Sequence, residues 1–477
     1  MPWSEALLPV RMRRVVLVAP RTGLRAALVR VADEGCMEPD LAEGVEPGPA
    51  AHRLQAAGGH PGPPLLASDP PLADEDGPGP AAALLKGEAE LEERARSAVT
   101  TGGIAALAGW CPAGAVAPLA RRLQGAGAAL VPVRRPRGVD PPTLLREARD
   151  PRRASFTPLV SAYGTVPYAD ADPSWPAGIA YVVMFGIMFG DVGHGALLVL
   201  LGLLLWRRTP RRLAAVRPAW PFLMGAGTCA VLMGFAYGEF FGGTDVLPAL
   251  WLRPLQQPER LLVAAVGFGA LMLALARGAG AVNRWREHGP SGALYAATGC
   301  AGLALYLGLA LAAAALATHR AALAAAGGCL AALGLALTAT GVFRTTGGGP
   351  EGGTETAVRL FDVVVRVGTN TVSFARLAAF GLTHAALADL VWRGTAGLAG
   401  HGGAGLAGAC VLFAVGTAAS FALEALVAGV QALRLEYYEI FSQLFESQGR
   451  PFRPWHVPLA DPVRGAADPE VTACSRG

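Results

Sequence analysis

The sequence carries little charge for its length. Only 16% of its 477 residues are Asp, Glu, Lys or Arg, whereas 52% are hydrophobic and the mean hydropathy is +0.39. This composition is too apolar for a soluble enzyme of this size. The long uncharged runs lie almost entirely after Ala177. We therefore expect a soluble N-terminal part followed by a polytopic membrane part.

The motifs of many soluble enzymes are also missing. The sequence has no GxxxxGKS or GxxxxGKT, no GxGxxG after a strand, no HExxH and no GxSxG. We expect no catalytic residues, no nucleotide site and no cofactor, so the energy for any ion movement has to come from a partner. The seven cysteines form no CxxC pair and no metal-ligand spacing, and we expect no metal site.

Basic clusters and an N-terminal leader are not found either. The net charge is only +4, Lys86 is the single lysine, and no basic cluster is interleaved with aromatic residues. Nucleic-acid binding therefore has no support. The first residues contain no apolar run of the kind found in signal peptides. We expect the N-terminal part to stay in the cytoplasm.

Residues 1–160 are predicted to form a cytoplasmic α+β domain of two short strand–helix units. A Gly/Pro-rich segment without periodicity, 41–80, is interpreted as a loop or linker, and residues 141–164 as an extended basic segment. The predicted strands are 15–18, 35–40, 104–112 and 128–135, and the predicted helices are 21–33, 81–98 and 112–127.

Residues 161–455 are predicted to form the transmembrane domain, followed by a disordered cytoplasmic tail over 456–477. Seven apolar runs are found, at 177–206, 217–241, 260–276, 291–318, 321–343, 363–392 and 404–435. Arginines gather in the loops after the first, third and fifth runs. The positive-inside rule places these loops in the cytoplasm, together with the C-terminus.

With both termini inside, the chain needs an even number of membrane crossings. Run 177–206 then has to enter and return, although two full spans need about 40 residues. It offers a break at MFGDVGHG, residues 188–195, where three glycines stand beside Asp191 and His194. The expected fold is mainly α. About eight membrane helices, the first two a short broken hairpin and the last two long and tilted, follow the small α+β domain.

An arginine within an apolar run is the most unusual feature of the sequence. Residues 370–392 are interpreted as a membrane-spanning helix, and Arg376 lies near the centre of the run 363–392. A charge at that depth costs from about 3 to more than about 10 kcal/mol, so it is either paired for packing or faces water or a moving charge. Further polar side chains form a stripe on this helix: Ser373, Thr383 and His384.

The last apolar run carries a second set of polar residues. Glu424 lies deep in the run, and Gln431 follows seven residues later on the same face. Arg434 follows ten residues after Glu424 and either belongs to this face or snorkels to the interface. Glu436 and Glu439 then extend into the interface. Because Glu424 has no such exit, we interpret it as a proton-relay group.

Two further candidates have structural alternatives. Asp191 and His194 either line an aqueous access path or form a turn in which the aspartate caps the helix after the break. Glu239, in GFAYGEFFGG at an outer helix end, either lines such a path or has a capping or interfacial role, and we favour the latter.

Four motifs in order resemble one family, subunit a/I of the V-type and archaeal A-type rotary ATPases. These motifs are FGIMFGDVGHG, GFAYGEFFGG, VSFARLAAFGLTHAAL and LEALVAGVQALRLEYYEIFSQLFESQGRPFRPW. PPTLLREARDP and ALAGWCP are similar to segments of the family's soluble domain. The resemblance covers 140–460 strongly and 9–135 weakly. The soluble domain departs from the family in being much shorter.

The resemblance implies a membrane stator of a rotary ATPase or ATP synthase. Its last two helices would press against a proteolipid ring whose subunits each carry an ion-binding carboxylate. Arg376 would face that carboxylate and separate two half-channels, and Arg434 would be a second important cation. Glu424 and His384 match half-channel positions. The remaining candidates for the lining are Ser373, Thr383, Gln431, Asp191, His194 and Glu239.

The resemblance also implies partners and a location. Peripheral stalk subunits would meet the N-terminal domain, a central stalk subunit would meet the ring, and the ATPase head would be coupled indirectly. The chain would lie in the lipid of a bacterial or archaeal-type cell membrane with both termini cytoplasmic. Because His384 and Glu424 suit proton exchange, we favour H⁺ over Na⁺ as the transported ion.

Two other functions are left open by the residues alone. In a secondary transporter, Arg376 would bind an anionic substrate, and inverted repeats with paired broken helices would support that function. The sequence has one broken hairpin and no repeat. A non-conducting scaffold would have no reason to bear the cost of intramembrane Arg, His and Glu.

Overall fold

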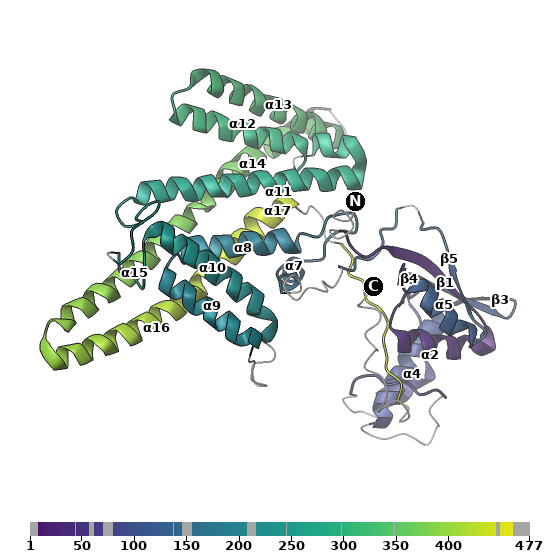
Figure 1. Ribbon diagram of the computed structural model, residues 1–477. Coiled ribbons are helices and arrows are strands. Elements are labelled where there is room, and N and C mark those ends of the chain that lie inside the picture. The colour runs from purple at the N-terminus through teal and green to yellow at the C-terminus, as the bar shows by residue number, and fades with distance from the viewer. Residues whose placement is uncertain are drawn as a thin grey trace. The chain divides into compact units, whose positions relative to one another are not determined.

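The computed structural model describes residues 8–460 except 43, 57–61, 70–79, 137, 146–154, 208–215, 245, 297, 347–348 and 445–448. The chain forms two compact units. The first contains Met1–Glu147, Thr165–Tyr168 and Gly449–Gly477, and the second contains Ala148–Gly164 and Ala169–Gln448. The strands belong to the first unit and the long helices to the second (Figure 1).

The first unit is built on an antiparallel sheet. Its strands are β1 (Met12–Pro20), β2 (Glu38–Pro39), β3 (Val99–Thr101), β4 (Ile104–Pro112) and β5 (Ala129–Pro132). They are ordered β2–β4–β1–β5, and β3 also pairs with β4. Along β1, Val15, Leu17 and Ala19 are buried, which is the period of two expected when one face of a strand packs on a core.

The helices of the first unit supply the rest of its core. They are α2 (Leu24–Glu34), which follows the short helix η1 (Arg21–Gly23), α3 (Pro49–Ala56), α4 (Pro80–Ser97) and α5 (Val116–Gln124). Leu28, Leu91, Leu119 and Leu123 pack with the buried residues of β1 in one hydrophobic cluster. The predicted strands and helices of this region are all found. The sequence analysis did not predict β3 or α3.

Two segments interpreted as irregular contain helices among their described residues. The linker 41–80 contains α3, and Leu66 within it is fully buried in the core of the first unit. The extended segment 141–164 contains the helix α7 (Thr157–Tyr163). Both contain prolines and small residues and lack the apolar periodicity that reveals a helix. Their order depends on packing against other elements, which sequence periodicity does not report.

The C-terminal segment also packs in the first unit. The Trp455 backbone N–H donates to the Met37 carbonyl oxygen at 2.9 Å, and its indole N–H donates to Glu90 at 3.1 Å. Val457 is fully buried and its N–H donates to the Ala32 carbonyl oxygen at 3.2 Å. Residues 456–460 were assigned to the disordered tail, but within this segment Val457 is buried in the core, and Pro458 and Ala460 make backbone hydrogen bonds with Leu66. Residues 461–477 lie outside the described residues.

The second unit is an assembly of apolar helices. Six segments are long and apolar enough to cross a membrane: Val216–Tyr237, Pro258–Glu287, Gly289–Ala317, Ala321–Arg344, Glu351–Ala399 and Gly402–Leu444. Two shorter apolar helices, α8 (Ser174–Met188) and α9 (Val192–Arg207), precede them. Together they match the expected set of about eight helices. The chain is thus an integral membrane protein.

The remaining helices of this unit are α10 (Trp220–Tyr237), α11 (Pro258–Tyr295), α12 (Cys300–Ala317), α13 (Ala321–Thr345), α14 (Gly349–Ser373), α15 (Ala375–Ala399) and α16 (Gly402–Leu435), ending in the π-helical turn η3 (Glu436–Phe441) and α17 (Ser442–Leu444). Helices α12 and α13 pack as a pair, and so do α15 and α16 (Figure 1). This second pair carries the predicted site residues of the last two apolar runs except Ser373, which is the last residue of α14.

The break predicted in the first apolar run is confirmed. Helix α8 ends at Met188 and α9 begins at Val192, and α10 packs against both helices. Glycines allow the close approach of α10. A Cβ atom at Gly227 would lie 2.7 Å from the Gly195 carbonyl oxygen, and one at Gly234 would lie 2.3 Å from the Val192 nitrogen. Small residues at helix interfaces are typical of membrane proteins.

Replacing Gly234 by alanine is expected to destabilise this packing. The added methyl group would meet backbone atoms of Asp191 and Val192, which cannot move aside as a side chain can. We expect a loss of about 1–3 kcal/mol, seen as a lower thermal unfolding midpoint of the detergent-solubilised protein. Gly267→Ala in α11 is the matched control, because nothing lies within 4 Å of its added Cβ atom. Equal midpoints for the two variants would contradict this packing.

Two helix boundaries differ from the expectation. The arginine-containing loop predicted at 277–288 is helical and continues α11, where Arg277 and Arg284 are buried. Arginine and alanine favour helix, so this segment is helical although the apolar run ends before it. The single helix predicted over 370–392 is interrupted at Phe374, a fully buried residue between α14 and α15.

Candidate functional site

Polar side chains gather where the α8–α9 break meets α15 and α16. Nδ1 of His384 on α15 makes a short hydrogen bond with Oε2 of Glu424 on α16. The other carboxylate oxygen, Oε1, accepts a hydrogen bond from the Ser420 hydroxyl at 2.7 Å. Both His384 and Glu424 are buried. The two residues that the sequence placed on separate helices therefore form one bonded pair.

Asp191 and His194 complete this group, which we call the buried histidine cluster: Asp191, His194, His384 and Glu424. The two imidazole rings lie 5.5 Å apart between centroids, and the Phe189 ring packs against both. Nδ1 of His194 lies 3.6 Å from Oδ1 of Asp191. The break in the first apolar run thus brings its polar residues to the His384–Glu424 pair.

Asp191 also has the structural role that was its alternative. Its Oδ1 accepts the His194 backbone N–H at 2.8 Å and so caps the start of α9. Its Oδ2 accepts the Gly242 backbone N–H at 3.0 Å and so ties down the loop after α10. A capping role and a position in the buried histidine cluster are therefore compatible.

Replacing Asp191 by alanine should lower the stability of the second unit. The two buried N–H groups of His194 and Gly242 would lose their acceptor, and each unsatisfied donor costs about 1–3 kcal/mol. The midpoint of thermal unfolding in detergent measures this loss. Asp191→Asn keeps one carbonyl acceptor and should lose less. If alanine and asparagine are equally tolerated, the two hydrogen bonds do not contribute to stability.

Glu239 lies close to the buried histidine cluster. Its side chain is buried, its charge interacts with those of His384 and Asp191, and Oε1 has no hydrogen-bond partner among the described residues. Its backbone carbonyl oxygen accepts the Val192 N–H at 3.0 Å. The backbone of Glu239 thus supports the start of α9. Among the described residues, its carboxylate caps no helix.

A second set of polar residues surrounds the interruption between α14 and α15. Arg376 stands in the first turn of α15, and the charges that act on it come from Arg434 on α16 and Glu439 on η3. Nη1 of Arg376 is buried and has no hydrogen-bond partner in the described part of the chain. We call Arg376 and Arg434 the arginine pair. It places two positive charges near one carboxylate.

The arginine pair and the buried histidine cluster share α15 and α16. Arg376 and His384 are eight residues apart on α15, which corresponds to about 12 Å along the helix axis. Gln431 of α16 is half-buried, and its Oε1 has no partner among the residues described. Thr383 is exposed and Ser373 lies next to Glu439. Of the ten predicted site residues, four thus form the buried histidine cluster and two form the arginine pair.

Two glutamates at the end of α16 are buried within the chain. Glu436 and Glu439 were expected to extend into the interface, and neither oxygen of Glu436 has a hydrogen-bond partner in the described residues. Both glutamates continue the buried face of α16, which carries Ala428, Ala432 and Leu435 at helical spacing. Residues Glu436–Phe441 form the π-helical turn η3.

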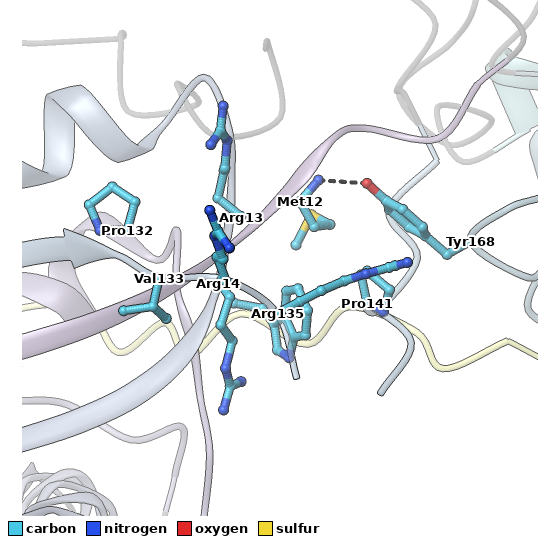
Figure 2. Close-up of a pocket in the computed structure, with 10 residues that line it drawn as sticks. Met12, Arg13, Arg14, Pro132, Val133, Arg135, Pro141 and Tyr168 are labelled. Atoms are coloured by element: carbon cyan, nitrogen blue, oxygen red, sulfur yellow. Dashed lines mark hydrogen bonds between the residues drawn. The ribbon is translucent and has the colours of Figure 1, made fainter. Parts of the chain in front are cut away.

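Two cavities are lined by residues outside the buried histidine cluster and the arginine pair. A hollow of about 500 Å³ on α14 is lined by Val364, Val365, Gly368, Thr369, Val372 and Ser373. A pocket of about 380 Å³ in the first unit is lined in part by four arginines: Arg13, Arg14, Arg134 and Arg135. Figure 2 shows the second pocket, where the Met12 N–H donates to the Tyr168 hydroxyl at 3.0 Å. No predicted site residue lines it.

Comparison with known proteins finds relatives among subunits of V-type and A-type ATPases and ATP synthases. A family model described as the V-type ATPase 116kDa subunit family matches residues 97–247. The A-type ATP synthase subunit I of Thermococcus kodakarensis is 27% identical over 367 residues, which cover 73% of this chain and 54% of that protein.

Two shorter matches have higher identity. V-type ATP synthase subunit I 2 of Treponema pallidum is 40% identical over 97 residues, 20% of this chain and 21% of that protein. V-type proton ATPase 116 kDa subunit a 3 of Homo sapiens is 36% identical over 121 residues, 23% of this chain and 14% of that protein. The chain thus spans about half the length of these curated relatives or less.

Proposed function

We propose that this chain, which belongs to the V-type ATPase 116 kDa subunit family, is the membrane stator of a rotary ATPase or ATP synthase. In this role it would form the ion path next to a ring of proteolipid subunits. Ion movement through the path would be coupled to ring rotation and, through a central stalk, to ATP hydrolysis or synthesis in the head. The first unit would hold the peripheral stalk.

The observation that carries this proposal is a charged surface that the chain does not cover. Only 6% of the most apolar window of α16 is buried within the chain, compared with 22–39% in the other five membrane segments. Arg434 is exposed on this helix, and the exposed Thr383 lies on the neighbouring α15. The Thr383 hydroxyl donates to the Ala379 carbonyl oxygen at 2.9 Å, but lipid tails would leave the Arg434 guanidinium unsatisfied, so a protein partner or water has to face it.

The arginine pair suits a ring that presents carboxylates. A fixed cation favours the ionised form of a passing carboxylate and so promotes release of its ion. It also repels other cations that would leak past it. Each elementary charge that crosses the membrane yields about 2.3 kcal/mol per 100 mV, which is the energy available for coupling.

The buried histidine cluster suits one half-channel. His384 and Glu424 share a hydrogen bond, and both residue types can gain and lose protons. The pair is therefore a relay point at which a proton can leave the aqueous side for the ring. This assignment favours H⁺ as the transported ion. The comparisons do not favour the alternative of a secondary transporter.

Photo-crosslinking in native membranes tests the ring contact. A photoreactive residue at Val372 on α14 or Val430 on α16, both exposed, should form an adduct with a small proteolipid. The same residue at Leu333 on α13, which is also exposed, is the control and should not. A proteolipid adduct from Leu333 alone, or none from Val372 and Val430, would refute the proposed arrangement.

A further inference from the structure

Three side chains of the buried histidine cluster have the composition of a metal site. Ligand atoms of Asp191, His194 and His384 all lie within 4.8 Å of one another, and all three residues are buried. Asp191 directly precedes α9, His194 lies in the first turn of α9, and His384 lies on α15. Two imidazoles and one carboxylate form the donor set that binds first-row divalent metals such as Zn²⁺.

Among the described residues, three ring nitrogens of the two histidines have no hydrogen-bond partner, whereas each carboxylate oxygen of Asp191 accepts one backbone N–H and keeps a second lone pair. Neither ring nitrogen of His194 has a hydrogen-bond partner among the described residues, and Nε2 of His384 has none either. Three buried polar nitrogens without partners are costly unless something binds them. A single water molecule or a metal ion between the three residues would satisfy them.

The neighbour of His384 favours a metal ion over water. Glu424 binds Nδ1 of His384, which fixes the ring and leaves Nε2 to face the other ligands. A carboxylate behind a histidine is the usual support of a metal-binding imidazole. Asp191 and Glu424 also bring two carboxylates to the cluster, which matches the charge of a divalent cation.

We propose that Asp191, His194 and His384 bind a Zn²⁺-like divalent ion, with Glu424 supporting His384. Two imidazole ligands disfavour Na⁺, Mg²⁺ and Ca²⁺, which prefer oxygen ligands. The ion bound at this site therefore differs in its chemistry from the transported ion. The sequence did not reveal this site, because its ligands lie 190 residues apart and meet only through the α8–α9 break.

Occupation of this site should inhibit ion transport, a consequence that rests on the proposed function. A bound ion would occupy the space between the α8–α9 break and α15 and hold Asp191 and His194 against that helix. The site then acts as a metal-dependent block of the half-channel.

Metal retention by the purified complex tests the binding. After treatment with EDTA, addition of Zn²⁺ and desalting, the wild-type complex should retain about one more Zn²⁺ per chain than the His194→Gln complex, and the affinity of this variant should fall at least about tenfold. Exposed cysteines are first blocked with N-ethylmaleimide. His52→Gln, which changes an exposed histidine of the first unit, is the matched control and should retain the ion.

Two results separate the site from its consequence. Equal Zn²⁺ retention by wild type and His194→Gln would overturn the site, whatever the complex transports. Co²⁺ in place of Zn²⁺ should give the visible absorption of a four-coordinate ion in wild type only. If Zn²⁺ binds but ATP-driven acidification by wild type is no more sensitive to it than that by His194→Gln, the block is overturned while the site stands.

Discussion

Arg376→Ala should abolish ion pumping while the complex still assembles. ATP-driven acidification of membrane vesicles should fall below about a tenth of the wild-type rate, because the ring carboxylate would lose the cation that drives release of its ion. Assembly should survive because the described residues offer Arg376 no hydrogen-bond partner for Nη1, so its removal breaks few contacts within the chain. Co-purification of the ring and the head measures assembly.

An arginine on the same helix provides the matched control. Arg393 of α15 is exposed and pairs with Asp389 one turn away, at 2.8 Å. Such a surface pair contributes at most about 1 kcal/mol, so Arg393→Ala should pump at nearly the wild-type rate. Coupled pumping by Arg376→Ala would show that the assignment of Arg376 is wrong. Equal losses in both variants would show that the effect is not specific to the position of Arg376.

Glu424→Gln should cause the second large loss. Glutamine keeps the size of the side chain and can still accept the hydrogen bond from Ser420, but it cannot take up and release a proton. Because relay groups of this kind contribute about 100-fold or more, we expect acidification to fall to the limit of detection. The measurement is the initial rate of acidification after ATP addition, normalised to the amount of assembled complex.

Two further variants sharpen the role of Glu424. Glu424→Asp keeps the ionisable group and should recover part of the rate that Glu424→Gln loses. If Glu424 only held His384 by a hydrogen bond, an ionisable group would not be required. Glu355→Gln is the control, because Glu355 is exposed on α14 and pairs with Arg359. A normal rate in Glu424→Gln would exclude the His384–Glu424 pair from the ion path.

Much of the fold follows from patterns within single segments. The alternating burial of β1 and the apolar runs of the second unit are visible as periods of two and as uncharged stretches. The break at Phe189–Asp191 follows from glycines and from the number of crossings that two cytoplasmic termini require. These features depend on residues close together in the chain, so sequence reasoning reaches them.

The rest depends on contacts between distant segments. The π-helical turn over Glu436–Phe441 and the interruption at Phe374 have no signal in the composition of their segments. The pairing of Trp455 and Val457 with α2 and its flanks joins residues more than 400 positions apart. The candidate site shares this property. Each of its residues was predicted, but the bond between His384 and Glu424 was not.

The most direct test compares complexes that differ only in this chain. The head, stalks and ring are purified with and without it and reconstituted into vesicles, and the pH gradient formed after ATP addition is recorded with a fluorescent dye. The account predicts a gradient that requires this chain and collapses with a protonophore. An equal gradient in vesicles without the chain would contradict the claim that it forms the ion path.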